Sequence, residues 1–225
     1  MGTITLVPTP IGNLEDITLR ALRYLKESDK IAAEDTRVTR NLLNHFNITV
    51  PLISLHSYNE HALVNRLIEQ VQTENWKLSV VSDAGTPGIS DPGFLLVREA
   101  LKAGLEIETL PGPTAFVPAL INSGLPCDRF VFEGFLPVKK GRQTRLKQLQ
   151  PETRTIILYE SPHRLLKTLE ELSGICGEDR LVSVSKEISK KFEKHFRGSL
   201  AEVKSALQGT VPKGEWVIIV GGNEK

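Results

Sequence analysis

Short apolar runs rich in β-branched residues alternate with segments of helical periodicity in the first half of the chain. This alternation is typical of strand–helix units packed around a mostly parallel sheet. The expected strands are Thr3–Val7, Lys30–Ala33, Leu52–Leu55, Leu78–Ser82 and Glu106–Leu110. One expected helix opens near Asp16, with Leu19, Leu22 and Leu25 on one face. The other expected helices are Val38–Phe46, Glu60–Gln72 and Phe94–Ala103.

The apolar pattern restarts with different strand lengths after the stretch "PGPTAFVPALINSGLP". Strands are expected within "RFVFEGF", "TRTIILYES", "RLVSVSKEI", "KHFRGSL" and "EWVIIVGG". Helices are expected at Arg142–Gln150, His163–Leu172 and Leu200–Leu207. Little helix separates the last strands, which favours a mixed sheet with an antiparallel part. We therefore expect an N-terminal α/β domain with a mostly parallel sheet over residues 1–113 and a C-terminal α/β domain with a mixed sheet over residues 114–225.

Composition narrows the class of protein. At 225 residues the chain can bury a sizeable core without disulfides. Cys127 and Cys176 fit no metal-binding or CxxC spacing, so a reducing compartment is expected and no metal. The chain shows no secretory signal and no apolar run near the ~20 residues that span a bilayer, so we expect a cytoplasmic protein without membrane contact. With 28 basic and 27 acidic residues, any nucleic-acid partner must be met by a local patch.

Unusual loops follow four of the expected strands. "PTPIGN" follows the first strand, "EDTR" the second, "SDAGTPGISDPG" the fourth and "PGPTA" the fifth. In open α/β sheets ligands bind beyond the carboxyl ends of the strands, so these loops predict one shared pocket. The alternative is that glycine and proline only make turns there.

The loops do not suit a polyphosphate. The chain has no GxxxxGK[ST] motif, and no GxGxxG follows the first strand. Asp83 and Asp91 would repel phosphate groups, whereas both suit a ligand that offers donors or positive charge. Small residues between positions 84 and 88 allow close approach to a flat ring, and a helix beginning near Thr114 could receive a carboxylate. An adenosine with a cationic centre fits these features.

Several motifs together resemble one family. "VPTPIGNLEDITLRAL", "AAEDTR", "VSDAGTPGISDPG", "LPGPTA", "DRFVFEGFLP", "YESPHR" and "KGEWVIIV" occur in the order seen in the bacterial small-subunit (16S) ribosomal RNA 2′-O-ribose methyltransferase I family. That family belongs to the tetrapyrrole-methylase superfamily of S-adenosylmethionine enzymes. The resemblance implies two α/β domains with an S-adenosylmethionine-binding cleft between them, a homodimer, and methylation of a cytidine ribose in the decoding centre of the small ribosomal subunit. The first loop reads "PTPIGN" where precorrin enzymes usually carry a GxGPGD-like sequence, which favours the RNA-modifying branch.

The resemblance also implies which residues face the cofactor. They lie in the strand-end loops, after the "PGP" turn, at the end of a strand of the second domain and in the last loop. The implied positions are Pro8, Ile11, Gly12, Asp83, Ala84, Gly85, Thr86, Thr114, Ala115, Tyr159 and Gly214.

Methyl transfer to a ribose hydroxyl would benefit from a general base, which typically adds ~10²–10⁴-fold in rate. We expect the catalytic residues to be Asp35, Lys186 and Glu187, with His163 as a less favoured candidate. The alternatives are structural. Asp35 would cap the helix that follows while Arg37 pairs with a nearby carboxylate, and the Lys-Glu pair would be a solvated strand end.

Two basic clusters are candidates for RNA contact because phosphates supply much of the affinity for nucleic acid. One comprises Lys139, Lys140, Arg142, Arg145 and Lys147, and the other comprises Lys186, Lys190, Lys191, Lys194 and Arg197. The alternative for each cluster is a solvated face.

A homodimer is also expected from the helix "PTAFVPALINSGL". Its residues Phe116, Val117, Leu120 and Ile121 present more apolar surface than a small sheet readily covers. Two rival functions remain open for the chain as a whole: a tetrapyrrole (precorrin-type) methylase, and a non-catalytic nucleotide-binding module that docks on ribosomes.

Overall fold

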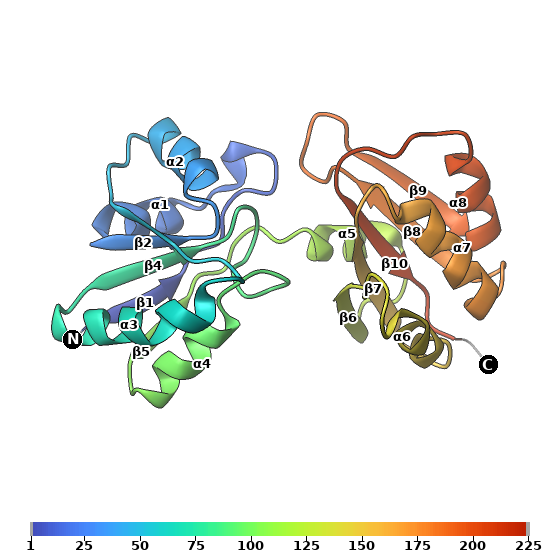
Figure 1. Ribbon diagram of the computed structural model, residues 1–225. Helices are drawn as coiled ribbons and strands as arrows, with labels where there is room; N and C mark the ends of the chain where they lie inside the picture. Colours follow the sequence, from blue (N-terminus) through green and yellow to red (C-terminus); the bar gives the residue numbers. More distant parts are fainter. Residues whose placement is uncertain (1, 224–225) are drawn as a thin grey trace. The chain divides into compact units, whose positions relative to one another are not determined.

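Two five-stranded sheets organise the chain in a computed structural model that describes residues 2–223. Each sheet lies in its own unit, Met1–Thr114 and Ala115–Lys225, hereafter the N-terminal and C-terminal units (Figure 1). No helix among residues 2–223 is long and apolar enough to cross a membrane. In the same residues, no group of three or more His, Cys, Asp or Glu side chains is arranged to hold a metal ion.

The N-terminal sheet is entirely parallel, with strand order β3-β2-β4-β1-β5. Its strands are β1 (Thr3–Leu6), β2 (Lys30–Ala33), β3 (Leu52–Ser54), β4 (Lys77–Val81) and β5 (Glu106–Thr109). Its helices are η1 (Leu14–Asp16), α1 (Leu19–Glu27), α2 (Thr36–His45), α3 (Glu60–Thr73) and α4 (Phe94–Lys102). Figure 1 shows α1 and α2 on one side of this sheet and α3 and α4 on the other.

Alternation along the strands builds two cores, one on each face of this sheet. Leu78 and Val80 of β4 pack with residues of α3 and α4, whereas Val81 packs with residues of α1 and α2. Both faces are therefore buried, and the central strand β4 is buried on both sides along residues 78–81.

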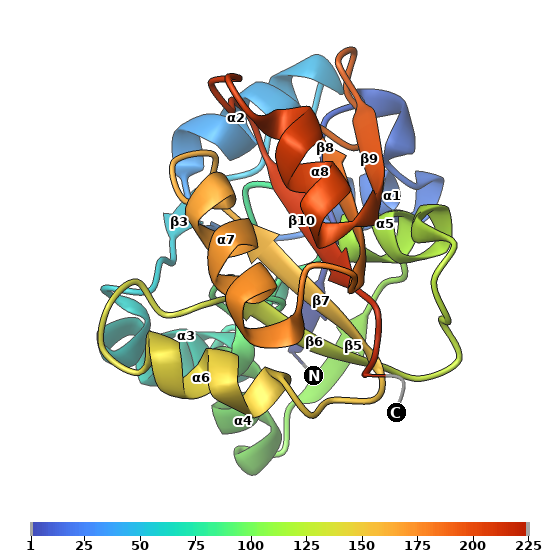
Figure 2. The ribbon, with the colours of Figure 1, turned by 90° about the vertical axis from the view of Figure 1, so that its right-hand side faces the viewer.

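The C-terminal sheet is mixed, with strand order β6-β7-β10-β8-β9. Its strands are β6 (Phe130–Phe135), β7 (Thr155–Glu160), β8 (Leu181–Lys186), β9 (Lys194–Ser199) and β10 (Trp216–Val220). Only β6 and β7 are parallel, and β10 and β9 run antiparallel to their neighbours. Its helices are α5 (Phe116–Ser123), α6 (Arg142–Leu149), α7 (Leu165–Cys176) and α8 (Leu200–Leu207). Figure 2 shows α7 and α8 lying across one face of this sheet.

The α/β class expected from the sequence is confirmed, while three local expectations are wrong. Thr18, rather than Asp16, caps α1, because its hydroxyl accepts the Ala21 N–H at 3.0 Å. Leu19 is 86% exposed instead of facing the core, since it is the first residue of the helix. Leu120, expected at a dimer interface, is 4% exposed within the core of the C-terminal unit, where α5 packs on β10, β8 and β7.

Candidate functional site

The carboxyl ends of β2, β4, β1 and β5 meet at one edge of the N-terminal sheet, because these strands are parallel neighbours. Thr9 and Gly85 exchange two backbone N–H···O bonds of 2.9 Å, which ties the first strand-end loop to the loop after β4. The Thr86 hydroxyl donates to the Pro113 carbonyl at 3.1 Å and ties that loop to the one after β5. The loop after β2 joins them through the Asp35 N–H, which donates to Asp83, so direct contacts link all four unusual loops.

Backbone geometry at the centre of this edge requires glycine. Gly85 has φ +83°, a conformation that side-chain-bearing residues rarely adopt. Its α-carbon faces the Ile11 side chain and the Pro113 carbonyl, at 3.5 and 3.7 Å from where a β-carbon would stand. Of the neighbouring predicted positions, Pro8 is buried while Gly12 is exposed. Gly85 itself is buried, so this edge offers the small exposed residues Gly12 and Ala84 to a ligand.

A small cavity of about 250 Å³ opens beside these loops. It is lined by Thr9, Pro10, Gly12, Leu14, Val38, Thr39, Asn41, Leu42, Ser82 and Asp83. Two of the predicted cofactor-facing positions, Gly12 and Asp83, are among these residues. Sites that bury a drug-sized ligand usually exceed ~300 Å³, so this cavity suits only part of a ligand the size of S-adenosylmethionine.

Three carboxylates gather at the ends of β2 and β4. Asp83 accepts the backbone N–H of Asp35 at 2.9 Å, and the backbone N–H of Asp83 donates to Glu34, so the two strand ends hold each other. Burial, followed by the charge of Asp83, raises the pKa of Glu34, and burial also raises the pKa of Asp83. Burial, then the charges of Glu34 and Asp83, raises the pKa of Asp91 to about 7. This concentration of negative charge favours a ligand with positive charge or hydrogen-bond donors.

Asp35 has a different environment from these three acids. Its carboxylate caps α2 by accepting the Arg37 N–H at 2.8 Å, and it forms an ion pair with the Arg37 guanidinium at 2.6 Å. The side-chain and backbone hydrogen bonds from Arg37 lower the pKa of Asp35 to about 2. The alternative role of Asp35, as the cap of α2, therefore has direct geometric support. Its catalytic role stays a prediction.

Thr114 and Ala115 lie where the two units join. Thr114 ends the N-terminal unit and Ala115 begins the C-terminal unit. The helix expected from Thr114 begins at Phe116, with Ala115 as its N-cap residue. Because alanine has no polar side chain, no side-chain hydrogen bond caps this helix start. Their predicted contact with a cofactor stays a prediction.

Tyr159 lies at an edge of the C-terminal sheet where several strand ends meet. It pairs with Phe135 at the end of β6 and with Val217 near the start of β10. Its half-buried ring packs against the rings of Phe132 and Phe135, with centroids 5.2 and 5.7 Å away. The end of β8 lies at the same edge, because Lys186 pairs with Trp216.

Glu187 and Gly214 lie against each other at this edge of the C-terminal unit. Glu187 accepts the Glu215 N–H at 2.9 Å and pairs with Lys190 at 3.1 Å. Burial acts to raise its pKa, but these two contacts prevail and lower the pKa of Glu187. Gly214 has φ +80°, and a β-carbon there would collide with the Glu187 side chain. Lys186 lies over the Trp216 ring, 5.7 Å from its centroid. The catalytic roles predicted for Lys186 and Glu187 stay predictions.

Several residues of the two basic clusters form ion pairs or hydrogen bonds within the protein instead of facing a partner. Arg142 is 4% exposed and pairs with Glu171 at 2.7 Å, so its inclusion in an RNA-binding surface is wrong. Arg145 pairs with Glu133 at 2.6 Å. In the second cluster, Lys190 is paired with two carboxylates and Arg197 binds Asn122. Within the two clusters, the exposed lysines that form no ion pair with the described residues are Lys139, Lys140, Lys147, Lys191 and Lys194.

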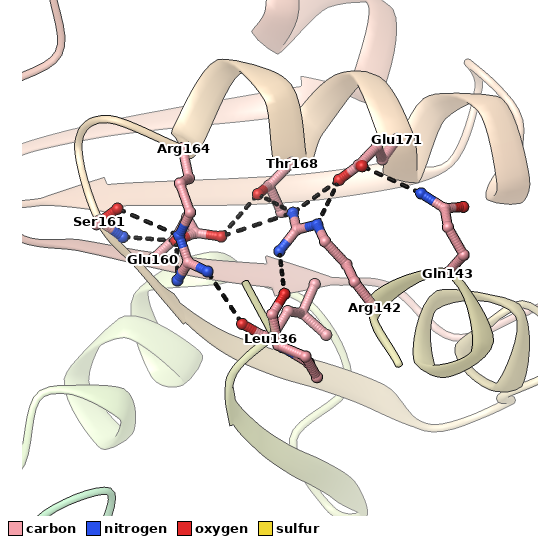
Figure 3. A network of polar contacts seen from close by, with 9 residues as sticks. Leu136, Arg142, Gln143, Glu160, Ser161, Arg164, Thr168 and Glu171 are labelled. Atoms are coloured by element: carbon pink, nitrogen blue, oxygen red, sulfur yellow. Dashed lines mark hydrogen bonds and ion pairs between the residues drawn. The ribbon is translucent and has the colours of Figure 1, made fainter. Parts of the chain in front are cut away.

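Glu160, within the "YESPHR" motif, is the centre of a buried network that sequence reasoning missed (Figure 3). Its carboxylate accepts the Ser161 N–H at 2.7 Å and the Thr168 hydroxyl at 2.6 Å. It also pairs with Arg164 at 2.7 Å and lies 3.9 Å from the guanidinium of Arg142. Charge and hydrogen bonding here are satisfied inside the protein, which indicates a structural role.

His56 was also missed, because the loop after β3 lacks the glycines and prolines of the other strand ends. Its backbone N–H donates to Asn59, whereas its Nδ1 atom is buried and has no hydrogen-bond partner among the described residues. Its charge lowers the pKa of Glu34, so it lies near the acidic strand ends. The sequence feature that could have identified His56 is its position just after a strand of the same sheet.

Close relatives match nearly the whole chain. A protein named Ribosomal RNA small subunit methyltransferase I from Halalkalibacterium halodurans is 49% identical over 223 residues, covering 99% of this chain and 76% of that protein. The protein of that name from Escherichia coli O157:H7 is 47% identical, covering 99% and 79%. Its counterpart from Thermotoga maritima is 45% identical and covers 100% of both chains.

Solved structures show the same fold at lower identity. Uroporphyrin-III-C-methyltransferase from Thermus thermophilus aligns with a TM-score of 0.68 at 21% identity, over 98% of this chain and 94% of that one. The methyltransferase CobJ aligns with a TM-score of 0.70 at 22% identity, over 99% and 95%. The family profile described as Tetrapyrrole (Corrin/Porphyrin) Methylases matches residues 3–204. The chain therefore belongs to the ribosomal RNA small subunit methyltransferase I family, within the S-adenosylmethionine-dependent tetrapyrrole methylases.

Proposed function

We propose that this protein transfers a methyl group from S-adenosylmethionine to the 2′-hydroxyl of a cytidine in the decoding centre of small-subunit ribosomal RNA. The observation that carries the proposal is the match to relatives named for ribosomal RNA methylation, at 45–49% identity over 98–100% of the chain. The sequence motifs that favour the RNA-modifying branch support the ribose as acceptor.

The residues at the edge of the N-terminal sheet fit the cofactor chemically. S-adenosylmethionine supplies an electrophilic methyl group on a positively charged sulfur. The acidic strand ends formed by Glu34, Asp83 and Asp91 attract such a charge, and the small exposed residues Gly12 and Ala84 leave room for a flat adenine. We retain the cofactor contacts that the resemblance implies, at Pro8, Ile11, Gly12, Asp83, Ala84, Gly85, Thr86, Thr114, Ala115, Tyr159 and Gly214.

The protein has two tasks in the transfer step. Holding the ribose oxygen in line with the carbon–sulfur bond can contribute ~7–11 kcal/mol through orientation. The hydroxyl proton must also leave, and a general base typically adds ~10²–10⁴-fold. Asp35 and Glu187 are carboxylates with lowered pKa values, which makes them weaker proton acceptors than Glu34 or Asp91, whose pKa values are raised. We therefore add Glu34 and Asp91 to the candidate bases.

We also propose a homodimer, with Val117 and Ile121 of the expected helix, rather than Leu120, at its interface. On α5, Leu120 is buried in its own unit, whereas Val117 and Ile121 are 44% and 65% exposed. An unpaired carboxylate buried at an interface is strongly unfavourable. Ile121→Glu should therefore give a folded monomer with weaker methyl transfer, whereas Ser205→Glu on the exposed face of α8 should leave the assembly unchanged. Sedimentation equilibrium checks both variants; a wild type that is monomeric at micromolar concentration yet active would refute the dimer.

A methyl-acceptor assay separates this function from its rivals. Unmodified small subunits, protein-free 16S RNA and a porphyrinoid are each incubated with the protein and radiolabelled S-adenosylmethionine. Ribonuclease-sensitive label supports the proposal, and label on the porphyrinoid selects a tetrapyrrole methylase. Cofactor binding without transfer to any acceptor selects a non-catalytic module.

A further inference from the structure

The segment between β6 and α6, residues 136–141, is fixed from its inner side by the Glu160 network (Figure 3). Arg164 donates to the carbonyl oxygen of Leu136 at 3.1 Å. Arg142 donates to the carbonyl oxygen of Pro137 at 3.2 Å. Because both guanidinium groups are held by buried carboxylates, the segment has a defined conformation although its outer side faces solvent.

An open pocket of about 430 Å³ lies beside this segment and wholly within the C-terminal unit. Its lining residues are Glu133, Phe135, Leu136, Pro137, Gly141, Thr144, Arg145 and Gln148. Phe135 is 53% exposed at the pocket although it is a large apolar residue. The volume falls in the range of small-molecule sites, which run from ~300 to ~1,000 Å³.

The lining suits a nucleobase. An exposed aromatic ring offers a surface on which any base can stack. Thr144 and Gln148 project polar groups that can bond the edge of a base, and Gln148 accepts a hydrogen bond from Arg145 at 3.1 Å. The charge of Arg145 is offset by Glu133, whose side chain is only 5% exposed, so the pocket itself is close to neutral.

Unpaired positive charge lies next to the pocket. Lys139 and Lys140 are exposed on the fixed segment and form no ion pair with the described residues. They directly precede Gly141, which lines the pocket. A neutral aromatic pocket bordered by two free lysines matches a nucleotide, with a flat base and a charged phosphate.

The pocket lies beside Tyr159, a predicted cofactor-facing residue of the same unit. The Phe135 ring packs on that of Tyr159, with centroids 5.7 Å apart. We propose that this pocket binds one nucleotide flanking the modified ribose, with its base stacked on Phe135 and its phosphates at Lys139 and Lys140. This inference rests on the proposed function, because it takes RNA as the substrate.

Phe135→Leu tests the stacking, since leucine keeps an apolar contact with Tyr159 but has no aromatic face. Affinity for unmodified small subunits, measured without turnover, should fall roughly 5- to 150-fold, because stacking contributes about that factor per base. Phe135→Trp should bind within about threefold of the wild type. Calorimetry with S-adenosylmethionine should give the same affinity for all three proteins. Wild-type subunit binding by Phe135→Leu, or an equal loss in Phe135→Trp, would overturn the proposal.

The double variant Lys139→Ala/Lys140→Ala tests the binding of phosphate. The slope of log affinity against log salt concentration should become shallower by about 0.7 for each phosphate of a single strand that the variant no longer neutralises. The control is Lys26→Ala/Lys77→Ala, two exposed lysines at the opposite, amino edge of the N-terminal sheet, which should leave the slope unchanged. Equal slopes for the two double variants would contradict phosphate binding at this segment. Failure of the proposed function is separate: the wild type would then bind subunits without methylating them.

Discussion

The carboxylates at the strand ends of the two units differ in whether they are paired with cations. At the N-terminal edge, Glu34, Asp83 and Asp91 lie together with raised pKa values, and Glu34 and Asp83 accept hydrogen bonds from backbone N–H groups rather than from cations. At the C-terminal edge, Glu160 is more deeply buried but is paired with Arg164 and hydrogen-bonded by neighbouring groups.

This difference distinguishes a ligand-binding site from a structural network. Buried charges that are fully paired hold a structure in one conformation, whereas uncompensated charges in a cleft are common where a ligand completes the site. We therefore assign the cofactor's positive charge to the N-terminal edge and a scaffolding role to the Glu160 network.

The largest expected effect is on the paired network. Arg142→Met should destabilise the C-terminal unit by ~3–5 kcal/mol, because it leaves Glu171 without its cation and the buried Glu160 with Arg164 alone. Urea unfolding followed by Trp216 fluorescence in a Trp76→Phe background measures this, since each unit contains one tryptophan. Lys147→Met on the exposed face of the same helix should stay within ~0.5 kcal/mol of the wild type. Equal stability of the two variants would contradict the scaffolding role of the Glu160 network.

Asp83→Ala should act on binding instead of stability. Losing hydrogen bonds to a charged group costs ~1.5–3 kcal/mol, so S-adenosylmethionine should bind roughly 10- to 150-fold more weakly. The sheet should remain folded, because Asp83 is exposed and its partner, the Asp35 N–H, can bond water. Calorimetry and circular dichroism report the two quantities, with exposed Glu27→Ala at the opposite sheet edge as control. Wild-type affinity in folded Asp83→Ala would contradict the binding role of the N-terminal edge.

The raised pKa of Asp91 implies that the stability of the N-terminal unit depends on pH. The folded state binds more protons than the unfolded state between about pH 4 and pH 7. The stability of the N-terminal unit should therefore fall as the pH rises through this window. Asp91→Asn should remove that loss and be more stable at pH 8 by ~1 kcal/mol, less than the full shift implies because the side chain is partly exposed.

Urea unfolding followed by Trp76, in a Trp216→Phe background, measures this effect at several pH values. Below pH 4 the variant and the wild type should be equally stable, and Glu27→Gln should reproduce the wild-type profile. A wild-type stability that rises from pH 4 to pH 7 would contradict the burial of an unpaired acid at this edge.

Asp35→Asn should have the smallest effect. Asparagine caps helices about as well as aspartate, so the midpoint of unfolding should hardly change. If the raised-pKa acids accept the proton, the rate of methyl transfer should stay within about tenfold of the wild type. A loss of ~10²-fold or more without a loss of stability would instead identify Asp35 as the base.

Most of the fold was predictable because hydrophobic periodicity fixes which segments become strands and helices. The parallel neighbours of the N-terminal sheet follow from strand–helix alternation, and the gathered loops follow from where parallel strands end. Helix starts were less predictable: Asp16 and Thr18 are both good caps, and only the packing of α1 decides between them.

The partners of charged residues could not be predicted from the sequence. Arg142 looked like one more basic residue beside Lys139 and Lys140, and its burial depends on carboxylates from β7 and α7 that come near only in the folded chain. Leu120 and Ile121 are adjacent and equally apolar, and only the direction in which α5 faces its sheet separates core from surface. Sequence patterns give the elements, whereas ion pairing and helix orientation need the tertiary structure.

The most direct test of the central claim is mass spectrometry of 16S RNA after incubation of unmodified small subunits with the protein and deuteromethyl-labelled S-adenosylmethionine. Nuclease fragments locate the label, and digestion to nucleosides distinguishes ribose from base methylation. We expect labelled 2′-O-methylcytidine in a decoding-centre fragment with the wild type, and far less label with Asp83→Ala. Label on a base, label outside the decoding centre, or no label on the RNA would contradict the proposed function.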